Sequence, residues 1–427
     1  MNRAILSGLL LILVANSVLA GAMQSPWHPI TLSTRSVPMK LRIIEVTSDG
    51  IGEETLVTIA FEFRDARGAQ MAIGLEVSGN NGAEFIKVPV ATLNGDLMVR
   101  GGKEWTAGEI SWLAGADWPN QHATQLKLRL VADDRMYLVV DVAEGPDARA
   151  YPVIAYNSAP PDLGGNDEYR KTKIVLRRMA KGRFIMGDDD AETQLKAPAH
   201  NVVLSKDYYM GVYEVTQRQW ERVMGSTPAK HAGEMRPVDS VDWNLIRGGT
   251  WPSGHPAVVS FMGVLRAKAR IPNSSASLPF DLPTEAQWEY ACRAGTSKDF
   301  HLPRPQGTDC SAKANDADPA LEPLGWYVAN CMDPENRGHR VVGRKIGNAW
   351  GLYDMHGNVY EWCLDWYGNY ETKAVDPVGS TIQMYRVFRG GSWFDQARDC
   401  VASSRKNNTP DFLSQDLGFR VSLVPTW

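Results

Sequence analysis

The sequence predicts an α+β protein in which an all-β, sandwich-like domain over residues 24–158 precedes a loop-rich domain over residues 173–427. Three observations support this division. The first part has short apolar runs between turn signals and no helical period, a pattern typical of antiparallel strands. The second part has two helix-start signatures. It also has two stretches dense in glycine and tryptophan, residues 351–366 and 386–400, which is typical of tight loops held by packed indoles.

Length and composition limit the class of protein. A chain of 427 residues exceeds one ordinary hydrophobic core, so two domains are expected. The net charge is −4 and no basic run occurs, so nothing in the sequence indicates a nucleic-acid partner. Residues 159–172, which are rich in proline, glycine and polar side chains, are predicted to link the two domains.

Residues 1–22 have the pattern of a signal peptide. Arg3 provides a short positive start, residues 5–14 are apolar, and residues 18–22 fit a small-residue cleavage site. The apolar run is too short for a comfortable membrane-spanning helix. We therefore expect a secreted or periplasmic protein without a membrane span after cleavage. An uncleaved N-terminal anchor is the alternative.

The N-terminal domain is predicted from its strands. Strands are expected at residues 56–63, 126–130 and 136–142, with turn residues at 79–82. Three tryptophans are interpreted as core and corner residues, because a carbohydrate-binding platform would need exposed rings. They are Trp105, Trp112 and Trp118.

The C-terminal domain should contain two short helices after its first strands. Thr216 followed by Gln219, and Thr284 followed by Gln287, are capping boxes that predict the two helix starts. Residues 296–345 keep no period of strand or helix. A long irregular stretch in a compact domain is usually functional, or is fastened by a disulfide or an ion.

All five cysteines lie in the C-terminal half: Cys292, Cys310, Cys331, Cys363 and Cys400. An exported protein meets an oxidising compartment, where thiols tend to pair, and an odd number leaves at least one unpaired. We prefer a disulfide between Cys310 and Cys331, which would fasten the irregular stretch. Cys292 is interpreted as a disulfide or core residue. No cysteine and histidine spacing typical of zinc occurs.

Six motifs occur in one order: FIMGD, YYMGVYEVTQRQW, LPTEAQWEYACRAG, GLYDMHGNVYEW, RVFRGGSW and LGFR. Over about residues 174–423 the chain thus resembles the formylglycine-generating enzymes, also called sulfatase-modifying factors. The resemblance implies their loop-rich fold, which is related in shape to C-type lectins. It also implies their founding activity, the oxidation of a sulfatase cysteine to formylglycine. Fold alone does not establish that activity, because function depends on the site.

The resemblance places a calcium ion at Asp354, Gly357, Val359 and Glu361. Calcium takes six to eight oxygen ligands, which carboxylates and backbone carbonyls can supply. Calcium is therefore an expected cofactor. The alternative is that the two carboxylates only cap turns.

In the family, two cysteines five residues apart hold Cu(I) after the GGS motif. Here the second position is Cys400, but the first is Asp395. A carboxylate is a hard donor that holds Cu(I) poorly and cannot form a disulfide with a substrate cysteine. The two-thiolate copper site is thus incomplete. Cys363 could replace the missing thiolate beside Cys400, although a structural disulfide of these two is the preferred interpretation.

Ser392 and Cys400 are the candidate catalytic residues. The resemblance places five residues in the substrate groove: Trp393, Asp395, Arg405, Asn408 and Asp416. Asp416 stands where catalytic members carry asparagine. Arg389, Arg405 and Arg420 could bind an anionic or peptide ligand, but bracing of loops is preferred because an arginine fork suits both roles.

Two hypotheses of function follow. The first is an exported family member that acts on protein cysteines, and Asp395 argues against it. The second is a non-catalytic protein that holds a protein, peptide or carbohydrate ligand, with the β domain as a docking module. A diverged oxidation is a weaker third possibility. A serine hydrolase is not indicated, because no GxSxG elbow occurs.

Overall fold

The computed structural model describes residues 13–15, 40–49, 56–64, 70–78, 86–88, 93–95, 98–100, 104–114, 126–133, 136–156, 159–189, 198–271, 278–302, 317–334, 336–370 and 373–425. The chain divides into two compact units. The first comprises Met1–Met136 and Ala155–Ala159, and the second comprises Tyr137–Ile154 and Pro160–Trp427. No helix among the described residues is long and apolar enough to cross a membrane.

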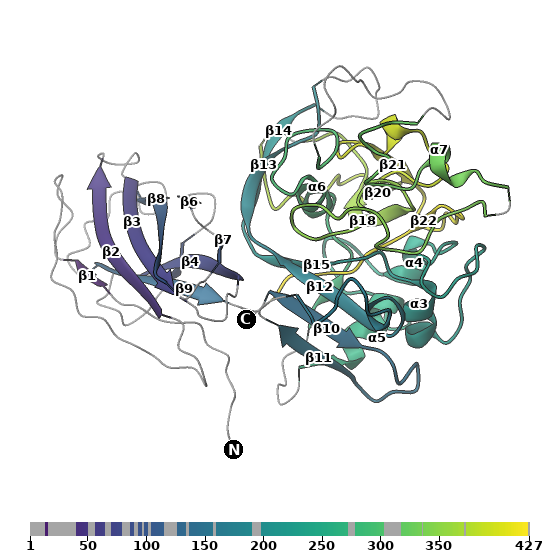
Figure 1. Ribbon diagram of the computed structural model, residues 1–427, viewed down its shortest axis with the longest axis horizontal. Coiled ribbons are helices and arrows are strands. Elements are labelled where there is room, and N and C mark those ends of the chain that lie inside the picture. The colour runs from purple at the N-terminus through teal and green to yellow at the C-terminus, as the bar shows by residue number, and fades with distance from the viewer. Residues whose placement is uncertain are drawn as a thin grey trace. The chain divides into compact units, whose positions relative to one another are not determined.

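The described strands of the first unit form two sheets (Figure 1). One contains β1 (Leu13–Ala15), β9 (Leu126–Asp133), β4 (Gln70–Ser78), β5 (Ile86–Lys87) and β7 (Met98–Arg100). The other contains β2 (Lys40–Asp49), β3 (Leu56–Arg64), β8 (Thr106–Leu113) and β6 (Leu93–Gly95). Burial alternates along β3, as expected for a strand with one face covered. A sandwich of the two sheets stays a prediction.

Residues 1–22 were predicted to be a signal peptide, and within them β1 pairs with β9. Of the three tryptophans, Trp112 is buried and Trp105 is half-buried with the Arg64 guanidinium over its ring. Trp118 lies outside the described residues.

The boundary between the units differs from the expected one. β10 (Tyr137–Asp141), assigned above to the N-terminal domain, pairs with β12 (Lys173–Met179) of the C-terminal unit. Its first four residues are all buried, as in a central strand covered on both faces.

The expected linker, residues 159–172, also packs against the C-terminal unit. Within it, α2 (Glu168–Lys171) buries Arg170, whose Nε donates to the carbonyl of Val342 at 3.1 Å.

Three sheets organise the C-terminal unit. The seven-stranded sheet has the order β16 (Ala269–Arg270), β11 (Tyr151–Tyr156), β10, β12, β15 (Tyr208–Gly211), β23 (Ser422–Leu423) and β17 (Phe280–Asp281). A three-stranded sheet contains β13 (Gly182–Met186), β14 (His200–Leu204) and β19 (Lys373–Val375). A four-stranded sheet contains β21 (Arg405–Asn408), β20 (Arg386–Arg389), β18 (Tyr360–Trp366) and β22 (Leu417–Gly418).

The C-terminal unit also contains short helices. They are α3 (Gln217–Met224), α4 (Trp243–Ile246), α5 (Phe261–Lys268), α6 (Glu285–Arg293), α7 (Val328–Cys331) and the 3₁₀ helix η3 (Ala397–Asp399). Both predicted capping boxes are confirmed, with Thr216 at the start of α3 and Thr284 at the start of α6. The coarse prediction that the C-terminal unit mixes helices and sheets is also confirmed.

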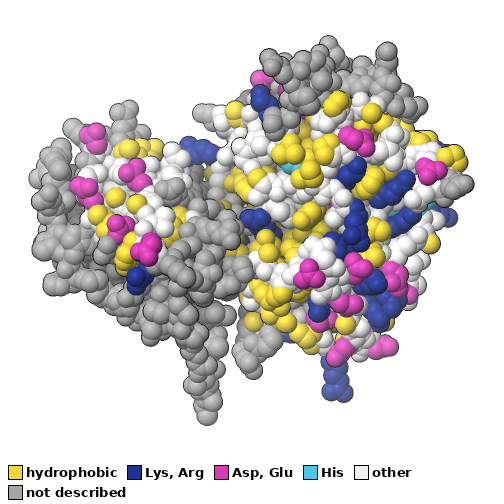
Figure 2. Space-filling model, viewed as in Figure 1, with side chains coloured by type: hydrophobic (Ala, Val, Ile, Leu, Met, Phe, Trp, Pro, Cys, Tyr) yellow, Lys and Arg dark blue, Asp and Glu magenta, His cyan; other side chains and the backbone are white. Residues whose placement is uncertain are grey.

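The core of the C-terminal unit forms around α6, which packs against β13, β18 and β20. Trp288 of α6 is fully buried in a cluster with Met210, Leu352 and Val387. On the face drawn in Figure 2, basic, acidic and hydrophobic side chains of this unit are intermingled.

Candidate functional site

The four-stranded sheet positions the candidate site. On β20 and β21, Phe388 lies opposite Lys406, and on β18 and β22, Tyr360 lies opposite Leu417. All four side chains line one pocket, so they share one face of the sheet. The strands therefore form the floor of the pocket.

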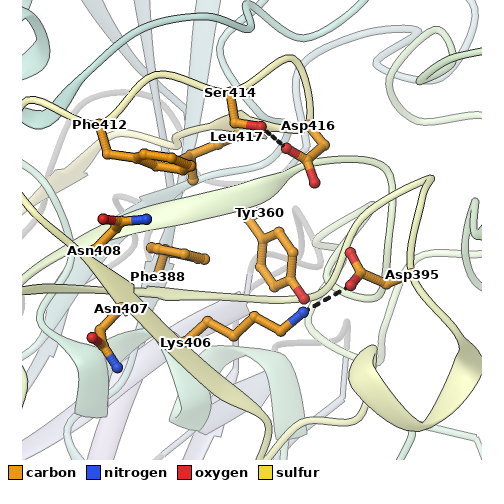
Figure 3. Close-up of a pocket in the computed structure, with 10 residues that line it drawn as sticks. All are labelled: Tyr360, Phe388, Asp395, Lys406, Asn407, Asn408, Phe412, Ser414, Asp416 and Leu417. Carbon is orange, nitrogen blue, oxygen red and sulfur yellow. Dashed lines mark hydrogen bonds and ion pairs between the residues drawn. The ribbon is translucent and has the colours of Figure 1, made fainter.

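The pocket has a volume of about 350 Å³ (Figure 3). Asn407 and Asn408 at the end of β21, together with the loop residues Asp395, Phe412, Ser414 and Asp416, complete its lining. Three residues predicted for the groove, Asp395, Asn408 and Asp416, are therefore brought together here. The walls combine aromatic rings with carboxylate, amide and hydroxyl groups, which can orient a ligand by both packing and hydrogen bonds.

Both carboxylate oxygens of Asp395 accept hydrogen bonds. Oδ1 accepts from the Lys406 ammonium at 2.8 Å, and Oδ2 accepts from the Ser392 hydroxyl (Figure 3 shows the ion pair). Burial opposes the charge of Lys406, but Asp395 and then Asp399 and Asp416 outweigh it, so the pKa of Lys406 is raised. The ion pair is thus a stable feature of the pocket at neutral pH.

Asp416 lies on the other side of Ser392. Its Oδ1 accepts from the Ser414 hydroxyl, and its Oδ2 lies 3.2 Å from Ser392 Oγ. Ser392 itself is fully buried. Its hydroxyl therefore serves as a bridge between the Asp395 and Asp416 carboxylates rather than as an exposed nucleophile.

Arg405 was wrongly assigned to the groove. It neighbours Lys406 on β21, so its side chain projects from the opposite face of the sheet. There it forms a two-pronged ion pair with Glu285, with Nε to Oε1 at 2.7 Å and Nη2 to Oε2 at 2.6 Å. Arg389 lies opposite Arg405 and pairs with Glu289. Both arginines brace the fold, as the preferred interpretation held.

Trp393 does not line the pocket. It is 1% exposed, and its indole packs edge-on to the ring of His231 at 5.2 Å between centroids. His231 in turn contacts His339, whose Nε2 lies 2.8 Å from Asp239 Oδ2. Trp393 thus supports the loop that carries Ser392 and Asp395.

Cys400 is buried in a separate apolar cluster with Phe300, Leu324 and Tyr327. It does not line the pocket, although it lies close enough to Tyr360 to raise the pKa of that phenol after burial and Asp395. Gly391 is essential to this packing, because a Cβ there would lie 2.4 Å from Cys400 Sγ.

The sequence of the C-terminal unit matches a known family. Residues 166–423 match the sulfatase-modifying factor enzyme 1-like domain. The chain belongs to this family. It is 28% identical over 322 residues to the formylglycine-generating enzyme of Bos taurus, which covers 65% of this chain and 82% of the relative.

Other relatives carry other names. The chaperone protein LppX of Paenibacillus barcinonensis is 29% identical over 248 residues, covering 52% of this chain and 81% of that protein. Among solved structures, Treponema denticola variable protein 1 aligns with a TM-score of 0.46 and 29% identity, covering 60% of this chain and 96% of that one. Family membership therefore confirms the resemblance, while the activity rests on the site.

Of the two carboxylates expected to bind calcium, only Asp354 has an oxygen that is available for an ion. Asp354 Oδ1 is buried and has no hydrogen-bond partner among the described residues. Burial, with Glu361 nearby, raises the pKa of Asp354 to about 6 despite the Gly343 amide and Arg420. In contrast, both Glu361 oxygens bind Arg420, and one also accepts from Trp288 Nε1 at 2.6 Å.

A third carboxylate near this place was missed by the sequence analysis. Glu214 accepts from Asn358 Nδ2 at 2.6 Å and from the Val359 amide at 3.1 Å. Burial, then Asp354 and Glu361, raise its pKa well above the usual value. Still, no three acidic, histidine or cysteine side chains among the described residues are arranged to hold one metal, so backbone carbonyls would have to complete a calcium site.

The disulfide expected between Cys363 and Cys400 is wrong. Both are buried thiols, and they occupy different hydrophobic clusters. Cys363 follows Tyr360 by three positions on β18 and therefore projects away from the pocket face. Cys292 is a buried core thiol, as one of its two interpretations held. Cys331 is also an unbridged thiol, and its expected partner Cys310 lies outside the described residues.

Several lining residues were not predicted: Tyr360, Phe388, Lys406 and Phe412. A usable signal was present for Lys406, since it stands two positions before the predicted groove residue Asn408 in the strand RKNN. Residues two apart on a strand share a face. The register that places Phe388 and Tyr360 beside them was not visible in the sequence.

Proposed function

We propose that this protein is an exported, diverged sulfatase-modifying-factor family member that holds a protein or peptide ligand in the pocket and does not perform two-thiolate copper oxidation. The observation that carries the proposal is the state of Asp395. Its carboxylate replaces the first thiolate and is committed to Lys406 and Ser392. The Lys406 ammonium beside it would repel a copper ion.

The ligand-binding part of the proposal rests on the pocket. An open hollow with aromatic walls and several polar groups suits a peptide segment. The relative named as a chaperone is consistent with a protein ligand. In the same proposal, the β-rich first unit forms a sandwich that serves as a docking module, and the family domain keeps a C-type-lectin-like shape.

Cu(I) binding tests the loss of the oxidase site. We expect the wild-type protein to lose Cu(I) completely to a chromophoric Cu(I) chelator and to leave a sulfatase-motif peptide unoxidised. Asp395→Cys restores a soft pair with Cys400, so it should retain Cu(I) at least about tenfold more tightly than the wild type. Titration against the chelator measures both proteins.

Cys400→Ala is the matched control in both backgrounds. Retention by Asp395→Cys should disappear when Cys400 is also replaced. Tight, Cys400-dependent Cu(I) binding by the wild type would overturn the proposal, because a second soft ligand would then have replaced the lost thiolate. Oxidation of the peptide by the wild type would do the same.

We also propose that calcium binds at Asp354 with the carbonyls of Gly357 and Val359, and that Glu361 supports the site through Arg420. Removing calcium with EDTA from a calcium-loaded sample should lower the thermal midpoint by roughly 5–10 °C, because bound ligand stabilises the folded state. Differential scanning calorimetry measures the shift. Glu361→Gln should lower the midpoint as well.

The variant Asp354→Asn distinguishes the effect of calcium binding on stability from the effect of the Asp354 hydrogen bond. The amide keeps an acceptor for the Gly343 amide, which donates to Asp354 Oδ2 at 2.6 Å, but it removes the charge. The variant should therefore respond little to EDTA. A wild-type midpoint that EDTA does not change would contradict the site.

A further inference from the structure

The pocket has more negative than positive charge. Among its lining residues, the Asp395 and Asp416 carboxylates face a single ammonium, that of Lys406. Lys406 forms an ion pair with Asp395, with Nζ 2.8 Å from Oδ1. Asp416 has no ion-pair partner among the described residues, and its hydrogen bonds there come only from Ser414 and Ser392.

The hydroxyl between the two carboxylates cannot satisfy both. A serine has one proton to donate, and Ser392 Oγ contacts both Asp395 Oδ2 and Asp416 Oδ2. Its closer partner is Asp395. Asp416 Oδ2 therefore faces the pocket with an acceptor that lacks its own donor.

Tyr360 provides an independent sign of a missing partner. Its side chain is only 4% exposed, and its hydroxyl makes no hydrogen bond of normal geometry with the described residues, although the Asp395 carboxylate lies near enough to raise the pKa of the phenol. Figure 3 shows that this hydroxyl points toward the Asp395 and Lys406 side of the pocket. A buried hydroxyl without a partner costs free energy unless a ligand or water supplies one.

The remaining lining suits a flexible apolar stem. Phe388 and Phe412 lie beside the polar groups (Figure 3). Aromatic rings attract cations and pack against methylene groups. An alkylammonium group carries three donors and no acceptor, which complements unsatisfied oxygens on Asp416 and Tyr360.

We propose that the pocket binds the alkylammonium group of a lysine side chain presented by a protein ligand, with Asp416 and Tyr360 receiving the ammonium and Phe388 and Phe412 covering the methylenes. This inference rests on the proposed ligand-binding function and assigns the chemistry of the ligand. Asp416 gives the pocket its excess charge, and at that position the resemblance set out above implies a neutral asparagine in catalytic relatives.

Isothermal titration of the full chain with blocked lysine, Nα-acetyl-lysine N-methylamide, tests the proposal. The corresponding norleucine amide is the neutral comparison, and cadaverine is a free diamine. We expect the lysine probe to bind at least about tenfold more tightly than the norleucine probe, as charge-assisted hydrogen bonds require. Asp416→Asn should abolish the difference by weakening only the lysine probe.

Two variants guard against misinterpretation. Asp411→Asn removes one negative charge at an exposed position outside the lining, and it should keep the preference for lysine. Lys406→Met removes the competing cation, so it should tighten binding of the lysine probe. A damaged pocket would instead weaken binding of both probes.

Three outcomes would overturn the inference. Equal affinity for lysine and norleucine would leave a peptide pocket that does not detect charge, so the proposed function would stand without this inference. Binding of cadaverine alone would replace the protein side chain by a small diamine. Absence of binding by every probe at millimolar concentration would remove the ligand-binding function as well, whereas the copper result would be unaffected.

Discussion

Replacing Arg389 with methionine is expected to lower the free energy of unfolding of the C-terminal unit by about 3–5 kcal/mol. Arg389 is fully buried on the side of the sheet away from the pocket. It pairs with Glu289, approaches Glu285 at 3.6 Å, and donates to the carbonyl of Ser403 at 2.9 Å. Removal would leave Glu289 as a buried charge without this partner.

The direction of the pKa shifts supports this expectation. Burial would lower the pKa of Arg389, but Tyr370, Glu289 and Glu285 outweigh it and raise the pKa. Burial likewise opposes ionisation of Glu285, yet Arg405 and Arg389 hold its pKa below the usual value. The charged groups therefore depend on one another, and loss of one is costly.

Urea unfolding followed by tryptophan fluorescence measures the effect. The matched control is Arg218→Met, because Arg218 pairs with Glu221 on the exposed surface of α3, with side chains 29% and 40% exposed. Such a pair contributes about 1 kcal/mol or less. Equal losses for the two variants would show that the buried network does not stabilise the fold.

Replacing Asp365 with asparagine is expected to stabilise the protein at about pH 8 by roughly 2–4 kcal/mol, and by only about 1 kcal/mol near pH 5. Asp365 is 2% exposed and accepts from the Glu285 amide at 2.7 Å. Burial, and then the charge of Glu285, raise the pKa of Asp365 to about 8. An asparagine oxygen keeps the acceptor without the charge.

The sign follows from proton binding. Between the unfolded pKa of about 4 and the folded pKa of about 8, the folded state holds a proton that the unfolded state has released. Stability of the wild type therefore falls as pH rises through this window. Asp365→Asn should show a flatter profile over the same range.

Denaturant unfolding at a series of pH values measures this profile. The values near pH 4 serve as the internal control, because at that pH the carboxyl is largely protonated in both the folded and the unfolded state. If the substitution changed stability equally at low and high pH, the raised pKa of Asp365 would not be the cause.

Local features of the fold were predictable, because they depend on neighbours in sequence. Thr216 and Thr284 begin their helices through contacts three residues away. Asp395, Asn408 and Asp416 were found through family motifs and do line the pocket. In each case the relevant information lies in a short segment.

Features that depend on strand register were not predictable. Arg405 and Lys406 are adjacent, and only the pairing of β20 with β21 decides which one faces the pocket. The thiols of Cys363 and Cys400 were expected together, although they lie in different hydrophobic clusters. Likewise, β10 was assigned to the wrong unit because its partner, β12, lies more than thirty residues further along the chain.

The position of β10 also bears on how the family domain can be isolated. The family match begins at residue 166, yet the compact unit already includes Tyr137–Ile154. A truncated protein that starts at the family boundary would lose β10 and β11 and leave β12 as an open sheet edge. Unprotected edges pair with other chains and promote aggregation. A soluble fragment should therefore start before Tyr137, upstream of the family-domain match.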